Sequence, residues 1–363
     1  MNTFGRTIGL TIFGESHGLS IGAVLDGLPS GEAIDWDAVR AEMARRAPGK
    51  NKMSTARSEK DAFEVQSGFF NGHTTGTPLC AIIRNSDQHS RDYDQLRHIM
   101  RPGHADYSGK IRYGGFNDYR GGGHFSGRLT APLVFAGAVA SQILARHGIT
   151  IGSHILRLAG IADKPFDAAG ETAETLQALK KETLPVLDKA QAGPMEEKIL
   201  EAKNDLDSVG GVIECMVTGL PAGIGDPFFD SVESQLSHMM FSVPAVKGIE
   251  FGDGFALADL RGSQANDAFY YDGDTVKTRT NHSGGINGGI TNGMPVVFRL
   301  AVKPTASISQ KQETIDTDTK ENCDLVIKGR HDPCIVQRAI PVVEAAAAWA
   351  ILDVCLSEKG RCW

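Results

Sequence analysis

A pair of matching turn signals, about 200 residues apart, constrains the fold of this chain most strongly. The segment AVLDGLPSG at 23–31 recurs as CMVTGLPAG at 215–223, and SGFFNGHTTGTPLCAII at 67–83 resembles SGGINGGITNGMPVVFRL at 283–300. Each half is expected to contain an apolar strand, a Gly-Leu-Pro-x-Gly turn, an amphipathic helix, a Gly-rich loop and a second strand. The period exceeds the roughly 20–50 residues of solenoid repeats, so it predicts two related halves packed about a pseudo-twofold axis. Chance similarity between turn-forming segments is the alternative.

Three segments carry the pattern of helices. In DWDAVRAEMARRAPG at 35–49, Asp35 is expected to cap a helix with one apolar stripe, which ends before the Pro-Gly pair. The segments at 130–148 and 340–360 are apolar on nearly every face, have a proline near the start and end at a glycine, and Thr130 is expected to cap the first of them. Helices that are apolar all round are buried, so these two predict a helical layer covered by sheets.

The length of 363 residues allows one large domain or two. No segment has the composition of a linker, and residues 167–207, rich in Glu, Lys and Ala, are expected to form a peripheral helical excursion. We therefore predict a single domain over 1–363 of the α+β class. Its expected architecture is a β-α-β sandwich with internal pseudo-twofold duplication and a buried helical layer between the sheets.

Composition narrows the class of partner. The 42 glycines exceed the ordinary share of roughly 7%, which indicates several ordered loops that approach a ligand closely. A net charge of −7 argues against nucleic acid as the main partner. The six cysteines show no paired spacing, the N-terminus lacks the features of a signal peptide, and the apolar run at 131–145 is typical of a core helix. We expect a reduced, cytoplasmic protein without a membrane partner.

Polar, Gly-bearing loops precede both apolar helices. DYRGGGHFSGRLT at 118–130 and IKGRHDPCIVQRA at 327–339 each place Arg and His side chains before an expected helix N-terminus. Helix N-termini favour anions because their N–H groups are unpaired and carry partial positive charge. Tight turns with ordinary capping are the structural alternative, but two such loops favour an anion site. The basic run GKNKMSTARSEK at 49–60 and KPTASIS at 303–309 offer further anion contacts.

Two histidines lie in short loops next to glycine. FGESHG at 13–18 resembles a hydrolase nucleophile elbow, but that pattern needs Ser at the centre of G-x-S-x-G, and here His17 precedes the last glycine. RPGHADY at 101–107 presents Arg101, His104 and Asp106 together on a rigid turn. A structural role for either histidine is the alternative. A further polar loop lacks the ligand spacing of a zinc or calcium site, although it contains Asp87, His89, Asp92 and Asp94.

Eight motifs, in this order and across nearly the whole chain, closely resemble the chorismate synthase family: FGESHG, RRAPG, RPGHADY, DYRGGG, VKGIEFGDGF, NHSGGINGG, KPTAS and GRHDPC. The resemblance implies a β-α-β sandwich assembled into homotetramers. It also implies conversion of 5-enolpyruvylshikimate 3-phosphate to chorismate by 1,4-anti-elimination of phosphate, in the shikimate pathway of aromatic amino-acid biosynthesis, with reduced FMN and no net oxidation. Reduction of the FMN by the chain's own NAD(P)H-dependent activity and reduction by an external enzyme both stay open.

The same resemblance implies roles for individual residues. His17 would protonate the reduced flavin, His104 would assist the departing phosphate as a general acid, and Asp332 would serve the flavin N5. Flavin contacts would come from His124, Phe125, Ser126, Pro244, Ala245, Gly288, Lys303, Pro304, Thr305, Ala306, Ser307 and Arg330. Substrate contacts would come from Arg46, Lys52, Arg128 and Arg338. Cations suit a substrate that carries a phosphate and two carboxylates.

Two departures from the family pattern concern this site. Many members have Arg-Ser-Ser-Ala-Arg where this chain has HFSGR at 124–128, and many have Arg where Lys52 stands, so that a point charge replaces a planar fork. Two rival functions would use the same residue types. Metal analysis would reveal a phosphatase or metal hydrolase, and a turnover assay would reveal an FMN-binding or assembly protein without catalytic activity.

Overall fold

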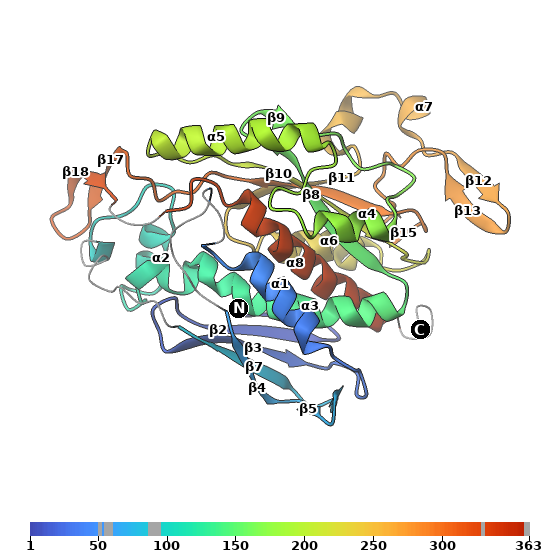
Figure 1. Cartoon of the computed structure of the whole chain (residues 1–363), viewed down its shortest axis with the longest axis horizontal. Coiled ribbons are helices and arrows are strands. Elements are labelled where there is room, and N and C mark those ends of the chain that lie inside the picture. Colours follow the sequence, from blue (N-terminus) through green and yellow to red (C-terminus); the bar gives the residue numbers. More distant parts are fainter. Residues whose placement is uncertain (50–52, 54–60, 86–95, 328–330, 359–363) are drawn as a thin grey trace.

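The computed structural model describes residues 1–49, 53, 61–85, 96–327 and 331–358. Two five-stranded antiparallel sheets form its framework (Figure 1). The first sheet has the order β1 (Thr3–Phe4), β2 (Gly9–Gly14), β3 (Ser20–Asp26), β7 (Leu79–Arg84) and β4 (Phe63–Ser67). The second sheet has the order β11 (Val246–Phe251), β16 (Val296–Val302), β10 (Gly211–Thr218), β8 (Thr150–Leu158) and β9 (Ile161–Ala162).

Three helices lie between these sheets: α1 (Trp36–Arg46), α3 (Thr130–Arg146) and α8 (Val336–Ser357) (Figure 1). The helices α3 and α8 are in close contact, and a Cβ on Gly137 would come within 2.2 Å of Ala345 Cα. Both helices contribute to one hydrophobic core that also includes side chains of both sheets. The predicted α+β class is confirmed, and so is the burial of the two apolar helices.

Local signals placed some of the helix ends. The helix α8 begins at Val336, before the expected start at 340, so that Pro341 lies inside it. The Asp35 side chain accepts hydrogen bonds from Asp37 N and Ala38 N, so the predicted cap of α1 is confirmed. The prediction that Thr130 caps α3 is wrong, because its hydroxyl donates to Gly127 O. A 3₁₀ turn over Gly127–Leu129 precedes α3, and the Ser126 side chain caps that turn by accepting from Arg128 N. The chain therefore becomes helical three residues before the expected position.

Two segments are long and apolar enough to cross a membrane when judged by length and composition alone. Among the described residues they are Gly127–Arg146, in which 78% of the most apolar stretch is buried, and Val336–Ser357, in which all of that stretch is buried. Burial of this extent is typical of core helices and gives no support to a membrane span. The five cysteines that the structure describes are all free thiols.

Residues 167–207 pack partly on the second sheet and partly into the main core, to which Leu184, Val186, Met195 and Ile199 belong. They contain α4 (Ala173–Leu179), a 3₁₀ turn (Lys189–Gln191) and α5 (Ala192–Asn204), and Figure 1 shows α5 above the strands. Leu176 and Leu179 pack with Met216 and Val297 of the sheet.

The remaining described elements are short. The helices are α2 (Asp106–Arg112), α6 (Val232–Met240) and α7 (Gly262–Ala265), and 3₁₀ turns cover Arg120–Phe125, Phe228–Asp230 and Gly254–Asp259. Four hairpins pair β5 (Phe69–Phe70) with β6 (His73–Thr74), β12 (Phe269–Asp272) with β13 (Thr275–Thr278), β14 (Ile286–Asn287) with β15 (Ile290–Thr291), and β17 (Lys311–Asp316) with β18 (Glu321–Val326).

A buried cluster of charged side chains joins this excursion to the second sheet. His154 on β8 is fully buried, with Nδ1 3.0 Å from Asp163 Oδ2 and Nε2 2.9 Å from Glu214 Oε2. Glu214 also accepts from Arg299 Nε at 2.8 Å, and Asp163 accepts from the backbone N–H of Leu187. Each carboxylate therefore has several donors, as buried charges require.

The stability of the protein should fall as the pH rises above neutrality because of His154. Burial acts to lower its pKa, but hydrogen bonds to Asp163 and Glu214 raise the pKa above the ordinary value of 6.5. A group whose pKa is higher in the folded than in the unfolded state stabilises the protein fully at pH values below its unfolded-state pKa. This contribution is lost as the pH rises through the folded-state pKa. The pKa values of the two carboxyls are lowered in spite of burial, so their contributions are lost only in acid.

The free energy of unfolding, measured in urea between pH 6 and pH 9, should therefore decrease with pH. His154→Gln keeps hydrogen-bonding capacity but cannot titrate in this range, so the variant should show a flatter pH dependence. The same pH dependence in both proteins would contradict the assignment.

Candidate active site

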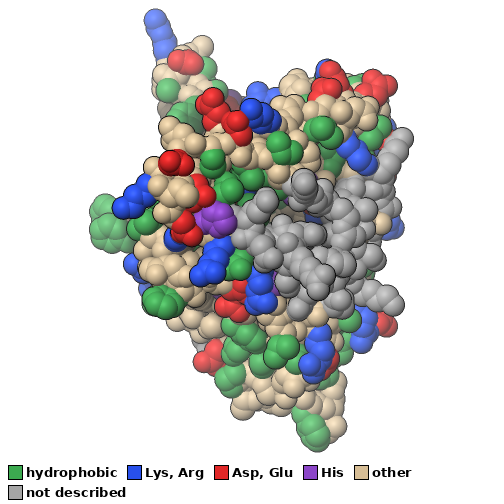
Figure 2. All heavy atoms as spheres, turned by 90° about the vertical axis from the view of Figure 1, so that its left-hand side faces the viewer, with side chains coloured by type: hydrophobic (Ala, Val, Ile, Leu, Met, Phe, Trp, Pro, Cys, Tyr) green, Lys and Arg blue, Asp and Glu red, His purple; other side chains and the backbone are tan. Residues whose placement is uncertain are grey.

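A cavity of about 680 Å³ lies where the N-terminal ends of α3 and α8 meet the loops around them. Both N-termini point toward the left of Figure 1, which is the face shown in Figure 2. On that face Lys, Arg, Asp and Glu side chains surround a His (Figure 2). Among the described residues that line the cavity, Asp332 is the one acidic residue, whereas six are basic: Arg46, Arg101, Arg128, Lys247, Lys303 and Arg338. Because the chain as a whole has a net charge of −7, this local excess of cations favours a polyanionic ligand.

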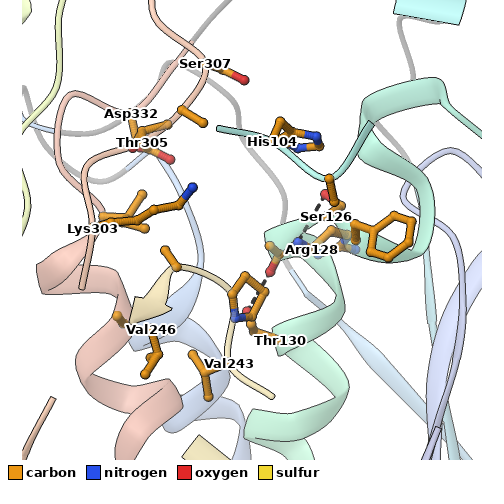
Figure 3. Close-up of a pocket in the computed structure, with 18 of the residues that line it drawn as sticks. His104, Ser126, Arg128, Thr130, Val243, Val246, Lys303, Thr305, Ser307 and Asp332 are labelled. Carbon is orange, nitrogen blue, oxygen red and sulfur yellow. Dashed lines mark hydrogen bonds between the residues drawn. The ribbon is translucent and has the colours of Figure 1, made fainter. Parts of the chain in front are cut away.

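The cavity brings together most of the residues that the sequence predicted for the site. They are Arg46, His104, His124, Phe125, Ser126, Arg128, Pro244, Ala245, Lys303, Pro304, Thr305, Ala306, Ser307, Asp332 and Arg338. Figure 3 shows Lys303, Thr305 and Asp332 on one side of the cavity, across from His104 and Ser126. Gly288 is exposed between β14 and β15 and does not line the cavity. Lys52 and Arg330 lie outside the described residues.

The glycines at 121–123 form a loop between the two predicted proton donors. All three have positive φ angles, of 59°, 84° and 53°. A Cβ on Gly121 would come within 2.2 Å of His17 Cε1, and one on Gly122 would lie 3.3 Å from His104 Cε1. Glycine is thus required both by the backbone and by the space beside the imidazoles. His17 is 5% exposed and lies behind Gly121, whereas His104 lines the cavity directly.

The turn at 101–106 holds His104 against a carboxylate. Asp106 accepts from Arg101 Nε and Nη2, both at 2.7 Å, and Asp106 Oδ1 lies 2.6 Å from His104 Nδ1. Burial alone would raise the pKa of Asp106, but hydrogen bonds from Arg101 and His104 hold it far below its ordinary value. Asp106 is therefore ionised at any physiological pH. The sequence had placed these three residues on one turn, and the structure shows them in contact.

Two arginines in the cavity wall share one buried carboxylate that sequence reasoning missed. Asp61 accepts from Arg46 Nε at 2.9 Å and from Arg128 Nη1. Arg46 also approaches the Thr130 hydroxyl, and Arg128 Nε donates to Asn85 Oδ1 at 3.1 Å. Burial lowers the pKa of Arg46, and Asp61 counteracts that effect. No short-range signal could have found Asp61, because its partners are 15 and 67 residues away in the sequence.

The opposite wall is built from the segment that follows β16 and the loop before α8. The Lys303 ammonium donates to Gly103 O, and Arg101 Nη1 donates to the Ser307 hydroxyl at 3.3 Å, so this segment contacts the turn that carries His104. Asp332 Oδ2 lies 2.5 Å from Arg338 Nη1. The Thr305 hydroxyl is buried without a hydrogen-bond partner among the described residues. A buried hydroxyl of this kind suggests that a ligand supplies its partner.

Comparison with known proteins agrees with this geometry. The family profile described as chorismate synthase matches residues 8–356. The chain belongs to the chorismate synthase family. It is 44% identical to a chorismate synthase of Dehalococcoides mccartyi over 98% of this chain and 96% of that one, and 45% identical to a chorismate synthase of Chitinophaga pinensis over 99% and 98%. A solved structure entitled "Crystal Structure of Chorismate Synthase" superimposes with a TM-score of 0.75 at 28% identity, covering 98% of this chain and 94% of that one.

Chorismate synthases are lyases that form chorismate for aromatic amino-acid biosynthesis with reduced FMN as cofactor, and this chain has that function. The cavity fits the cofactor. Its volume lies within the roughly 300–1,000 Å³ of small-molecule sites. Its wall offers Lys303, the unpartnered Thr305 hydroxyl and a Gly-rich backbone near the α3 N-terminus, which suit a flavin phosphate. Among the described residues, no group of three or more His, Cys, Asp or Glu is arranged to hold a metal ion.

Proposed function

We propose that this cavity is where 5-enolpyruvylshikimate 3-phosphate and FMN bind together and where phosphate is eliminated. The observation that carries the proposal is the arrangement of one wall with His104 and buried arginines opposite a second wall with Lys303 and Asp332 (Figure 3). A substrate with a phosphate and two carboxylates needs several fixed cations, because each anionic group loses hydration on entering.

Arg46, Arg128 and Arg338 are the proposed substrate ligands. Asp61 holds the first two guanidinium groups at fixed positions, and Arg338 Nε donates to Arg46 O at 3.2 Å, so all three belong to one connected network. Prior fixation of these side chains reduces the entropy lost when the substrate binds. We extend the same role to Lys52, which the sequence places in the adjoining basic run.

The flavin is proposed to lie against the wall formed by residues 303–307, with the other predicted contacts around it. When bound, reduced FMN supplies an electron-rich ring that assists removal of the substrate's C6 hydrogen. Lys303 and Thr305 offer donors to its polar groups, and Arg330 is proposed as a further cation. Both ring nitrogens of His124 are already hydrogen-bonded, to Gly14 O and Asn2 Oδ1. The ring would therefore pack against the flavin without offering it a free hydrogen-bond donor.

Three residues are proposed to handle protons. His104 gives a proton to the phosphate oxygen as the carbon–oxygen bond breaks, which prevents an unfavourable build-up of negative charge. Asp332 acts near the flavin N5, where its pairing with Arg338 links flavin and substrate sites. His17 is proposed to protonate the flavin. Because His17 lies behind Gly121, its proton would have to pass the edge of the Gly-rich loop to reach the flavin.

An anaerobic assay with 5-enolpyruvylshikimate 3-phosphate and reduced FMN tests the proposal. One phosphate should be released for each chorismate formed, with no stoichiometric oxidation of the flavin. Oxidation of one FMN per product, or phosphate release without FMN, would contradict it. The assay also separates this function from a phosphatase and from a catalytically silent FMN-binding protein.

We also propose that the chain is one domain made of two related halves. The strand order β2-β3-β7-β4 corresponds position by position to β8-β10-β16-β11, and the Gly-Leu-Pro-x-Gly turn follows the central strand of each sheet. The helices α3 and α8 each follow the last strand that the chain contributes to one five-stranded sheet, β7 for α3 and β16 for α8. One continuous core, with side chains from both sheets, supports a single domain.

A homotetramer is the proposed assembly and the cytoplasm the proposed location. Large apolar side chains are exposed at Phe228, Phe229 and Phe255, at 86%, 91% and 84%, which favours burial against another copy. We propose that Gly288, which does not line its own chain's cavity, contacts the flavin of a neighbouring copy. Free cysteines among the described residues are compatible with a reducing compartment. Light scattering of the purified protein measures the assembly.

A further inference from the structure

Asp106 and Arg101 form a bidentate ion pair that contacts one nitrogen of His104. Both oxygens of Asp106 accept from the Arg101 guanidinium at 2.7 Å, and Oδ2 also accepts from Arg101 N at 3.1 Å. The carboxylate is almost wholly buried, with its side chain 9% exposed. Its position is therefore fixed by the turn and not by solvent. His104 Nδ1 meets this fixed carboxylate at 2.6 Å.

The proton on Nδ1 follows from the chemistry of the two neighbours. Asp106 is ionised and can only accept, so an Nδ1 without hydrogen would face its oxygen at 2.6 Å with no proton between them, whereas the contact of Nδ1 with Arg101 Nη2 is longer, at 3.1 Å. The shorter contact to the carboxylate thus requires that Nδ1 carry hydrogen. Nδ1 is then protonated in both the neutral and the charged imidazole, which leaves Nε2 as the nitrogen that exchanges a proton.

Nε2 of His104 points away from the Arg101–Asp106 ion pair and toward the Gly-rich loop. A Cβ on Gly122 would lie 3.4 Å from it, and no described residue forms a hydrogen bond with it. Other titratable groups reach the same region from every neighbouring element. Besides Arg101 and Asp106, they are His17, Asp118 and Arg120 near the Gly-rich loop, Lys303 beside Gly103, and the cavity residues Arg46, His124, Arg128, Lys247, His331, Asp332 and Arg338.

We propose that Asp106, held by Arg101, is a positioning residue that keeps the proton of His104 on Nδ1 and directs Nε2–H at the leaving phosphate. The inference rests on the proposed role of His104 as general acid. During elimination the Nε2–H bond breaks, its proton passes to the phosphate oxygen, and neutral His104 stays protonated at Nδ1. Asp106 gains no proton in this step; its charge stabilises the imidazolium before transfer.

The test compares Asp106→Asn, His104→Ala, the double variant, and Glu64→Gln as a matched control. Glu64 also accepts a hydrogen bond from an arginine, with Arg84 Nε at 2.8 Å. This ion pair is exposed on the first sheet and does not contact a histidine. With saturating reduced FMN, Asp106→Asn should lower kcat by about 10–10²-fold, with a smaller change in KM. The alkaline limb of its kcat profile should move to lower pH, because the anion that stabilises the imidazolium is gone. The double variant should be no slower than His104→Ala alone, and Glu64→Gln should match the wild type.

The possible outcomes separate this inference from the proposed function. If His104→Ala is slow but Asp106→Asn keeps the wild-type rate and pH profile, the positioning role is wrong and the general acid stands. If His104→Ala is fully active, the general-acid role is wrong and the inference fails with it. Nitrogen NMR of histidine-labelled wild-type protein, with His104 assigned by the alanine variant, applies even if Asp106→Asn does not fold. A neutral His104 protonated at Nε2, and not at Nδ1, would overturn the proposal.

Discussion

Replacing His104 with alanine should slow chorismate formation by about 10²–10⁴-fold at saturating reduced FMN. The imidazole lines the cavity and its Nδ1 is fixed by Asp106, so its removal takes away a placed proton donor without opening the core. The phosphate would then leave without protonation, and the transition state would carry more negative charge. Single-turnover measurement of phosphate release under anaerobic conditions gives the rate directly.

His73→Ala provides the control for this variant. His73 is exposed on the hairpin of β5 and β6, which is separate from the first sheet, and it does not line the cavity, so its loss should leave the rate unchanged. FMN affinity, measured from the quenching of flavin fluorescence, should be similar in both variants and the wild type. A wild-type rate for His104→Ala would assign the residue to a structural role, and a loss of rate explained wholly by weaker FMN binding would assign it to cofactor binding. Either result would contradict its role as a proton donor.

Gly137→Ala should destabilise the protein by about 3 kcal/mol or more, at the upper end of the usual cost of overpacking. The new methyl group would lie 2.2 Å from Ala345 Cα and 2.4 Å from its carbonyl oxygen. These are backbone atoms of α8, so no side-chain rotation can relieve the contact, and α3 and α8 must separate. Because these helices support both Gly-bearing loops, the cavity should lose its geometry as well.

The matched control is Gly193→Ala on α5. Gly193 also lies in a helix, but a Cβ there meets no atom within 4 Å. The substitution should therefore stabilise the protein slightly, since alanine is favoured over glycine in helices by about 1 kcal/mol. Thermal unfolding and the yield of soluble protein compare the two variants. Equal stability of the two would show that the contact between α3 and α8 is not close.

Patterns of local origin predicted much of the fold. Asp35 capped α1 as expected because an N-cap depends only on the next three residues. The burial of α3 and α8 followed from apolar residues on every helix face. The prediction failed at Thr130 because Ser126 offered a better cap one turn earlier. Helix boundaries depend on such competition between neighbouring caps, which composition alone does not settle.

The sequence by itself determined the family, the class of fold and the residue types of the site, because the motifs are continuous and their chemistry is local. Only the tertiary structure decided which residues meet. It joined Arg46 and Arg128 through Asp61, placed His17 behind Gly121 and left Gly288 outside the cavity of its own chain. Contacts between distant segments depend on how the two sheets pack on the helices, and in a close-packed interior each position is set by all its neighbours together.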